Sequence, residues 1–391
     1  MPNNSYPSQS QLTFPLLEVL YDLGPSAPMD VYDAVAAIVQ VPEDALGALT
    51  AGGVRAWDRH VRWAEQRTQQ RALTRHPRRN RWELAERGVH TLEMAEPGIL
   101  HVAFKNPLGE VLWADSLTVL RGLPPSSVDL FFTSPPYYLQ KVKKYGGPTS
   151  EQEYLNWFLP FAREMHAALK DSGSLVLNIA PGPYLKGVPV RSPIVHRLVL
   201  ALMDQIGFYL AGEHIWHNPA ALPRPAEWVN VRRLRAKDTY EMVLWFSKTP
   251  WPNADNRRVL VAYSESQKKL IEKGWTAQRR PSGHELTGNM AKNHGGAIPG
   301  TVLTVPNTVS HDAYMRYCKE HNLDVHPARF PAQLPEWWIQ FVTDPGQLVV
   351  DPFAGSLTTA AVADRMGRRW MAIERSKVYI DGGIGGRLAG A

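Results

Sequence analysis

The sequence predicts an α/β fold with a mostly parallel sheet and helices on both faces, preceded by a separate helical domain. Short apolar runs of strand length, at 128–132 and 348–350, alternate with stretches that have helical periodicity. Such alternation is typical of a parallel sheet. Residues 1–95 differ, because they contain helical patterns and a hairpin instead. A chain of 391 residues has room for two or three domains.

The N-terminal region, residues 1–95, is expected to form a winged helix. Helical patterns at 12–23, 29–39 and about 54–73 precede a Pro-Arg-Arg-Asn turn at 77–80. Helices followed by a turn-linked hairpin are typical of this domain, in which one helix enters the major groove of DNA and the wing contacts the backbone. A small helical interaction domain with an exposed basic face is the alternative.

Residues 96–216 and 311–380 are expected to contribute to one sheet, with the active site at the carboxyl ends of its strands. Ser150 and Glu153 have the spacing of a capping box, which marks a helix start. In chain order the expected elements are a strand at 128–132, a helix at 151–169, a strand at 174–178, a helix at 193–206, a strand at 208–216, a helix after Pro335, a strand at 348–350, a helix at 355–366 and a strand at 369–373.

Two further segments break the alternation of strands and helices. Residues 217–310 are rich in Pro, Gly, Asn and basic residues, and a long irregular insert in an α/β domain is usually functional. We expect this insert to recognise the target of the protein. Residues 381–391 are rich in glycine and are expected to form a flexible tail.

The composition is that of a soluble globular protein, with 44% hydrophobic and 20% charged residues. The formal net charge of +6 favours an anionic partner. Nine arginines fall within 55–81 against two acids, an imbalance that favours a phosphate-binding surface over an ordinary solvated helix face. The arginines expected to contact DNA are Arg59, Arg62, Arg67, Arg71, Arg78 and Arg79.

Cys318 is the single cysteine, so the chain forms no internal disulfide and a reducing compartment is expected. This residue is expected to pack within a helix. The N-terminus lacks the basic start and apolar stretch of a signal peptide, and no apolar run approaches the ~18 residues of a membrane span. We therefore expect a cytoplasmic protein with no membrane partner.

Six short phrases of the sequence contain the candidate catalytic and cofactor-binding residues. They are Ala-Asp-Ser-Leu at 114–117, Ser-Ser-Val-Asp-Leu at 126–130, Thr-Ser-Pro-Pro-Tyr at 133–137, His-Pro-Ala-Arg-Phe-Pro at 326–331, Asp-Pro-Phe-Ala-Gly-Ser at 351–356 and Ile-Glu at 373–374. In this order they resemble the DNA N4-cytosine methyltransferases, in the circularly permuted (beta) class of amino-methyltransferases. The resemblance implies a Rossmann-like methyltransferase sheet that binds S-adenosylmethionine and methylates cytosine N4 in double-stranded DNA.

Phrases at 14–20 and 61–65 resemble the N-terminal winged-helix domain of Mrr-type restriction proteins. Together the two resemblances imply a site-specific DNA methyltransferase. Adenine N6 methylation and a non-catalytic DNA-binding regulator are the alternatives. A cognate restriction endonuclease and a homodimer are left open as further partners.

The Ser-Pro-Pro-Tyr phrase suits attack by an exocyclic amine, which is a poor nucleophile because its lone pair is delocalised into the base. The Ser134 hydroxyl and the Pro135 carbonyl can accept the two amine hydrogens, and the consecutive Pro135 and Pro136 stiffen this geometry. Tyr137 offers a face on which an extruded base can stack. In the resembled family, Ser at position 134 accompanies cytosine N4, whereas Asp or Asn accompanies adenine N6.

Asn178 departs from the pattern of the resembled family. Some relatives carry an Asp here that is thought to relay the departing proton near the catalytic serine. An amide cannot act as a base, so we expect the proton to leave to water through Ser134. The departure bears on the rate of the reaction rather than on its identity.

The Asp-Pro-Phe-Ala-Gly-Ser phrase has the pattern of a strand end, a tight turn and a helix N-terminus. Gly355 allows the backbone to approach a ligand closely, and free amides at the helix start suit a carboxylate. Glu374 ends the next strand and is placed to accept from ribose hydroxyls. The family usually has Gly where this chain has Leu357. The cofactor-binding residues implied by the resemblance are Asp115, His326, Phe330, Asp351, Pro352, Phe353, Ala354, Gly355, Ser356 and Glu374.

A cluster of basic residues near the start of the insert either contacts DNA or forms a solvated loop. Its members are Arg232, Arg233, Arg235 and Lys237. No His or Cys cluster has metal-ligand spacing, so no metal is expected.

Overall fold

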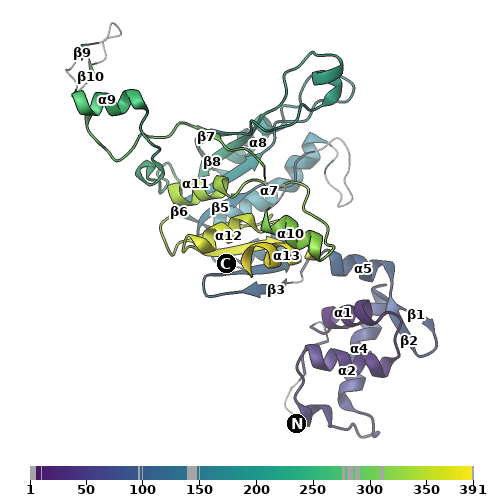
Figure 1. The fold of residues 1–391 in the computed structure, drawn as a ribbon. Helices are drawn as coiled ribbons and strands as arrows, with labels where there is room; N and C mark the ends of the chain where they lie inside the picture. Colours follow the sequence, from purple (N-terminus) through teal and green to yellow (C-terminus); the bar gives the residue numbers. More distant parts are fainter. Residues whose placement is uncertain are drawn as a thin grey trace. The chain divides into compact units, whose positions relative to one another are not determined.

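The computed structural model divides the chain into two compact units (Figure 1). The first unit comprises Met1–Ile99 with Arg375–Lys377, and the second comprises Leu100–Glu374 with Val378–Ala391. The residues that the structure describes are 6–9, 11–95, 97–98, 100–138, 148, 150–274, 278–279, 285–286, 291–308 and 312–389.

The first unit confirms the predicted order of helices followed by a hairpin. Its core is built on Tyr32, Trp57 and Trp82, and the Trp57 indole donates to the Tyr32 carbonyl at 2.8 Å. The two strands pair antiparallel with Arg78 opposite Arg81, so the predicted Pro-Arg-Arg-Asn turn is confirmed. In chain order the elements are α1 (Thr13–Leu23), α2 (Pro28–Ile38), α3 (Glu43–Leu46), α4 (Ala56–Gln70), β1 (Thr74–Arg78), β2 (Arg81–Leu84) and α5 (Glu86–Glu93).

The second unit is organised around a nine-stranded sheet with the order β11-β7-β8-β6-β5-β12-β13-β4-β3. Strands β4, β13, β12, β5 and β6 run parallel to one another, whereas β8 runs antiparallel to both of its neighbours. The strand bounds are β3 (Leu100–Lys105), β4 (Gly109–Ala114), β5 (Val128–Thr133), β6 (Leu169–Ile179), β7 (Tyr209–His217), β8 (Tyr240–Ser247), β11 (Val302–Thr304), β12 (Leu348–Asp351) and β13 (Arg369–Glu374).

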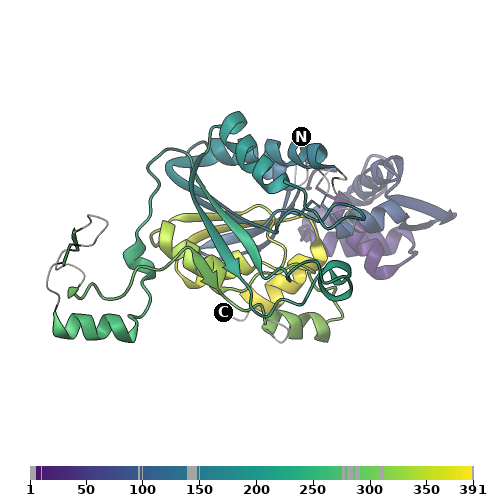
Figure 2. The same cartoon turned by 90° about the horizontal axis from the view of Figure 1, so that it is seen from above.

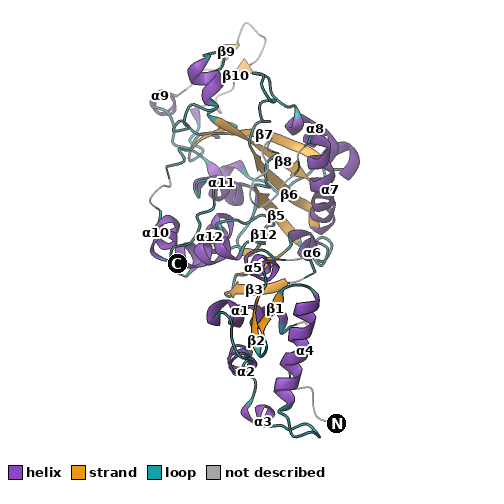
Figure 3. Ribbon diagram, turned by 90° about the vertical axis from the view of Figure 1, so that its right-hand side faces the viewer, coloured by secondary structure: helices purple, strands orange, loops and turns teal. Residues whose placement is uncertain are grey.

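Helices cover both faces of this sheet, as the sequence predicts. In Figure 3, α6, α7 and α8 lie on one side of the strands and α11 and α12 on the other. The core alternates along β5, where Phe131 joins the cluster under α7 and α8 while Phe132 contacts Phe330 edge to face. The helices are α6 (Ser116–Leu120), α7 (Glu151–Ala168), α8 (Ile194–Ala201) with the π-helical turn η1 (Leu202–Ile206), α10 (Ala313–Glu320), α11 (Gln333–Val342), α12 (Thr358–Arg365) and α13 (Lys377–Gly383).

The predicted insert at 217–310 is wrong in one respect, because it contains two strands of the sheet. The segment Tyr240–Ser247 forms β8, which lies between β7 and β6, and Val302–Thr304 forms β11 at the edge. The surrounding Pro- and Gly-rich sequence obscured an apolar run that has the burial of a central strand. The part of the insert outside these two strands is therefore split into two segments, 218–239 and 248–301.

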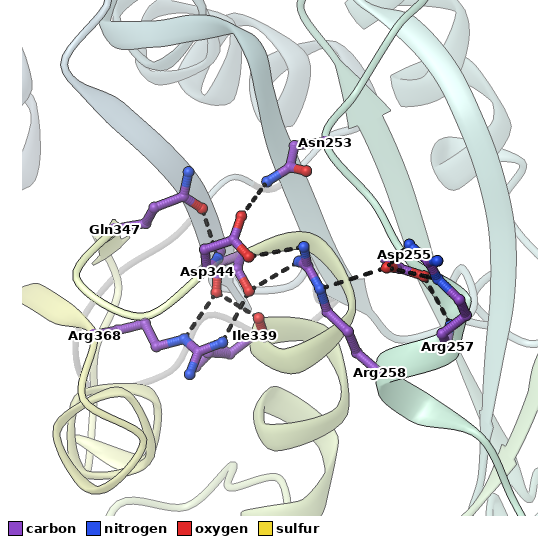
Figure 4. A network of polar contacts seen from close by, with 9 residues as sticks. Asn253, Asp255, Arg257, Arg258, Ile339, Asp344, Gln347 and Arg368 are labelled. Atoms are coloured by element: carbon purple, nitrogen blue, oxygen red, sulfur yellow. Dashed lines mark hydrogen bonds and ion pairs between the residues drawn. The ribbon is translucent and has the colours of Figure 1, made fainter. Parts of the chain in front are cut away.

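The second of these segments, 248–301, is tied at its start to the turn between α11 and β12 by a polar network (Figure 4). Arg258 pairs with Asp344 at 2.7 Å and donates to the Thr343 carbonyl at 3.2 Å. Asn253 donates to the same Asp344 at 3.2 Å. Beyond this anchor lies α9 (Glu265–Lys273), all of whose residues are among those that the structure describes. None of them is buried, and the helix lies away from the sheet (Figure 2).

The predicted flexible tail is also wrong, since 381–389 is packed. Residues up to Gly383 belong to α13, and the turn η5 (Ile384–Leu388) packs against α10. A side chain on Gly386 would put its Cβ 2.5 Å from the Tyr314 Cα, so this glycine provides close helix packing rather than freedom. The predicted tail residues 390–391 lie outside the described part of the chain.

Cys318 is buried on α10, which confirms its predicted packing role. Within the described residues, no helix is long and apolar enough to cross a membrane.

Candidate active site

The predicted catalytic and cofactor residues follow neighbouring strands of the sheet. Ser134 comes directly after β5, Asp351 ends β12 and Glu374 ends β13. Because these strands are parallel, their carboxyl ends meet at one edge, where ligands of open α/β sheets bind. The structure thus brings together two phrases that lie more than 200 residues apart in the chain.

A hydrogen bond joins the two phrases beneath the site. The buried Asp351 carboxylate accepts from the hydroxyls of Thr133 and Thr359, each at 2.6 Å, and from the Phe353 amide at 3.1 Å. Burial raises the pKa of Asp351 to about 6, although these hydrogen bonds oppose the shift. Thr133 immediately precedes the Ser-Pro-Pro-Tyr segment at 134–137, which we call the serine loop. Asp351 therefore fixes the serine loop against the loop that follows β12.

The serine loop aims its polar groups into a pocket. Ser134 is half-buried, and its hydroxyl oxygen lies 3.0 Å from the Tyr137 hydroxyl. Pro135 is buried and Pro136 is exposed. The pocket has a volume of about 810 Å³, within the range of small-molecule sites. Its lining includes Ser134, Tyr137, Asn178, Tyr184, Trp228 and Phe330.

Glu241 also lies in this site, although it is not among the residues that the sequence analysis identified. Its Oε2 accepts from the Tyr137 hydroxyl at 2.9 Å and from Asn178 Nδ2 at 2.7 Å. Because β8 runs against its neighbours, its amino end lies beside the carboxyl end of β6. The only signal in the sequence was an acid placed just before the apolar run 242–246.

Burial affects the protonation of both Glu241 and Tyr137. It raises the pKa of Glu241, and the hydrogen bonds from Tyr137 and Asn178 oppose the shift. Burial, followed by the charge of Glu241, raises the pKa of Tyr137 well above its usual value. The tyrosine therefore keeps its proton at neutral pH and stays a donor.

The loop after β12 combines a glycine with a carboxylate. Gly355 has φ +50°, and its amide donates to Glu374 Oε2 at 2.8 Å. A Cβ at this glycine would lie 3.0 Å from the His326 ring, so a larger residue would crowd the segment that crosses the loop. Leu357, at the position where the resembled family usually has glycine, also adopts a left-handed conformation with φ +61° and is fully buried. Its packing offsets the strain of that backbone.

Other predicted cofactor residues have protein partners of their own. The Asp115 side chain caps α6 by accepting from the Thr118 amide at 3.1 Å. Phe353 packs against Trp157 and Phe161 of α7, with ring centroids at 5.7 and 5.2 Å. The neighbouring residues Pro352, Ala354 and Ser356 complete the turn between β12 and α12, and the Ser116 hydroxyl donates to the Pro352 carbonyl.

Basic residues form a separate surface on α4 and the hairpin of the first unit. Buried Trp57 and Val61 occupy one face of α4, and the arginines project from the opposite face. All six predicted DNA-contacting arginines of this unit are exposed. Two arginines outside that set are engaged in ion pairs, Arg55 with Asp33 and Arg75 with Glu83.

Three members of the basic cluster at 232–237 have protein partners. Arg232 pairs with Glu227 at 2.7 Å, Arg235 donates to the Pro189 carbonyl at 2.8 Å and Lys237 donates to the Ala221 carbonyl at 3.1 Å. Arg233 is exposed and has φ +55°. These contacts shape a loop whose chain borders the active-site pocket at Trp228.

The sheet places the Ser-Pro-Pro-Tyr loop and the Asp-Pro-Phe-Ala-Gly-Ser loop at adjacent strand ends, the arrangement expected of an amino-methyltransferase. Residues 128–384 match the DNA methylase family, and residues 10–94 match the Mrr N-terminal domain. The chain therefore belongs to the DNA methylase family and carries an Mrr-type N-terminal domain, which confirms both predicted resemblances.

Individual relatives agree with this assignment. The type II methyltransferase M.PvuII of Proteus hauseri is 44% identical over 281 residues, which are 71% of this chain and 83% of the relative. The type II methyltransferase M.BglII of Bacillus subtilis is 29% identical over 278 residues, 71% of this chain and 68% of the relative. The solved structure of the cytosine-N4-specific PvuII DNA methyltransferase aligns with a TM-score of 0.61 and 37% identity, covering 75% of this chain and 90% of that one.

Proposed function

We propose that this chain transfers a methyl group from S-adenosylmethionine to N4 of cytosine in double-stranded DNA. The observation that carries the proposal is a half-buried serine, Ser134, in a Ser-Pro-Pro-Tyr loop that opens into a pocket large enough for a base. The 44% identity to M.PvuII and the likeness to the solved cytosine-N4-specific PvuII DNA methyltransferase support cytosine N4 as the acceptor.

The serine loop supplies what an exocyclic amine needs. The Ser134 hydroxyl and the Pro135 carbonyl accept the two amine hydrogens, which favours a pyramidal nitrogen with an available lone pair. When bound, S-adenosylmethionine supplies an electrophilic methyl group to that lone pair. The half-buried Tyr137, together with Phe330, provides aromatic surface for a base turned out of the duplex.

The identity of the methylated base tests the proposal directly. Double-stranded DNA incubated with the purified protein and S-adenosylmethionine is expected to yield N4-methylcytosine when its nucleosides are separated and weighed by mass spectrometry. Detection of N6-methyladenine in place of N4-methylcytosine would show that the methyl acceptor is adenine N6 and not cytosine N4. Absence of both modified bases across DNA of varied sequence would favour a DNA-binding regulator without activity.

The residues that would hold the cofactor are those of the loops after β12 and β13. Glu374 fits the ribose hydroxyls, because its carboxylate ends β13 and already accepts from a backbone donor. Gly355 and Ser356 fit close approach of the methionyl part, since their backbone forms the turn beside Glu374. His326 and Phe330 belong to the segment that crosses this turn, and Asp115 stands at the end of β4.

Substitution of Glu374 tests this placement. Glu374→Gln removes a charged acceptor, and the affinity for S-adenosylmethionine is expected to fall by about 10- to 100-fold, the range for a charge-assisted hydrogen bond. Isothermal titration calorimetry measures the change. Glu320→Gln, an exposed acid on α10, is the matched control and should bind the cofactor as the unchanged protein does. Equal affinity in both variants would remove Glu374 from the cofactor site.

DNA recognition would be shared between the two units. The loop 218–239, with Arg233 exposed and Trp228 at the pocket, and the segment 248–301, with α9 extended from the sheet, are placed to contact bases around the target. The arginine face of the first unit suits phosphate contacts, which position a protein without reading sequence.

The type II methyltransferases among the relatives support a cognate endonuclease for this chain. In that setting the protein acts on DNA in the cytoplasm. DNA methylated by the protein would then resist the nuclease that cuts the same site.

A further inference from the structure

A chain of hydrogen bonds leads from the catalytic serine to a carboxylate on another strand. The Ser134 hydroxyl lies 3.0 Å from the Tyr137 hydroxyl, which lies 2.9 Å from Glu241 Oε2. Asn178 Nδ2 donates to the same carboxylate oxygen at 2.7 Å. The three elements that supply these groups are the loop after β5, strand β6 and strand β8.

The hydrogen bonds that join Ser134, Tyr137 and Glu241 run in one fixed direction. Glu241 as a carboxylate can only accept, so the Tyr137 hydroxyl donates to it. The Tyr137 oxygen is then an acceptor for the Ser134 hydroxyl proton. This leaves the lone pairs of the Ser134 oxygen directed toward the pocket, where an amine hydrogen would be bound.

We propose that Glu241 is the proton acceptor at the end of a relay from Ser134 through Tyr137. The proposal rests on methylation of an exocyclic amine at Ser134, the proposed function. Glu241 acts through Tyr137, so it is a positioning residue. It takes the place that a carboxylate at position 178 would fill.

The step balances in atoms and charge. The methyl carbon–sulfur bond of the sulfonium breaks as the bond from the methyl carbon to N4 forms, which leaves the amine nitrogen with a positive charge and one proton too many. That proton passes to the Ser134 oxygen as the Ser134 proton passes to Tyr137 and the Tyr137 proton passes to Glu241. The products are the methylated amine, the neutral thioether and a protonated Glu241.

Asn178 has a definite place in this arrangement. Its Nδ2 holds the carboxylate of Glu241, whereas its buried Oδ1 accepts no hydrogen bond from the described residues. An acid at this position would put a second carboxylate within about 3 Å of Glu241, and like charges at that distance cannot both ionise easily. An amide on β6 is therefore the partner that a carboxylate on β8 requires.

The relay makes turnover depend on the protonation of Glu241. Only the ionised carboxylate can take up the proton, and burial raises its pKa, so kcat should fall as pH drops through that raised value. Tyrosines also line the pocket, and burial raises the pKa of two of them, Tyr137 and Tyr154, above the usual value. The other charged groups lining it are Arg191, Arg224, Asp238 and Arg329, of which Arg191 and Asp238 pair with each other.

Two substitutions interrupt the relay at different links. Glu241→Gln keeps the size of the side chain, and Tyr137→Phe keeps the ring. Each is expected to lower kcat by about 10²-fold, the lower range for loss of a proton acceptor, with little change in affinity for S-adenosylhomocysteine. The acid limb of the pH profile of kcat that belongs to Glu241 should vanish in Glu241→Gln.

A double variant separates a relay from a structural role. Asn178 Nδ2 lies 3.4 Å from the Tyr137 hydroxyl, so an acid at position 178 would reach the same hydrogen-bond chain. In Asn178→Asp/Glu241→Gln the carboxylate and the amide exchange strands, and kcat should recover to within roughly 10-fold of the unchanged protein. Asn178→Asp alone should lower kcat, because it adds the second carboxylate.

The readouts distinguish failure of the relay from failure of the proposed function. If the unchanged protein makes N4-methylcytosine and Glu241→Gln retains its kcat and pH profile, the relay is wrong. A double variant no faster than Glu241→Gln, although it binds S-adenosylhomocysteine normally, also overturns it. If the unchanged protein methylates no amine, the proposed function fails first. Glu320→Gln controls for removal of one carboxylate.

Discussion

Replacement of Ser134 by alanine is expected to lower kcat by about 10²-fold or more, while the affinity for S-adenosylmethionine stays near that of the unchanged protein. The hydroxyl is an acceptor for the amine and also the first link of the chain to Glu241. Its loss therefore affects the transition state. Cofactor binding is spared because the serine loop contacts the loop after β12 through Thr133, which the substitution leaves in place.

Single-turnover kinetics with a DNA duplex that contains the target, together with calorimetry of cofactor binding, measure the two quantities separately. Ser172→Ala is the matched control, since this exposed serine lies at the other end of β6. Glu374→Gln should show the reverse pattern, with weakened cofactor binding. A Ser134→Ala variant that lost cofactor affinity but kept its rate at saturating cofactor would contradict the role assigned to the serine.

Motifs that are local in sequence could be predicted, and groups that meet only through strand order could not. Ser134 and Asp351 each follow an apolar run of strand length, so their place at strand ends followed from the chain itself. Glu241 required knowledge that β8 lies antiparallel beside β6. Nothing in the residues around position 241 indicates that pairing, because it is set by the loops and by the rest of the sheet.

A glycine in a sequence can indicate either a flexible backbone or a site of close packing, and the sequence alone does not distinguish the two. The glycines near the C-terminus suggested a flexible tail, but Gly386 lets η5 pack within van der Waals reach of α10. Leu357 shows the converse, because a buried leucine occupies a left-handed turn that favours glycine. Burial and close contact decide these positions, and both depend on partners from distant parts of the chain.

Removal of residues 1–95 is expected to weaken DNA binding by about 10- to 100-fold at physiological salt and to flatten its salt dependence. The arginines on α4 and the hairpin are exposed, and each phosphate contact that is lost should reduce the slope of log affinity against log salt by about 0.9. The methylated sequence should not change, because the pocket and the segments beside it belong to the second unit. Binding titrations across salt concentrations and sequencing of methylated DNA measure both outcomes.

A second variant controls for disturbance of the cofactor site. The Ala95 amide donates to the Arg375 carbonyl at 2.7 Å, so deletion removes a partner of the residue that follows Glu374. Arg78→Gln/Arg79→Gln, at the exposed tip of the hairpin, leaves that contact intact and should lower the salt slope by up to about 1.8. If either variant methylates a relaxed or different sequence while binding S-adenosylmethionine normally, the winged helix reads bases. Phosphate contacts alone could not produce that result, because they carry no direct sequence information.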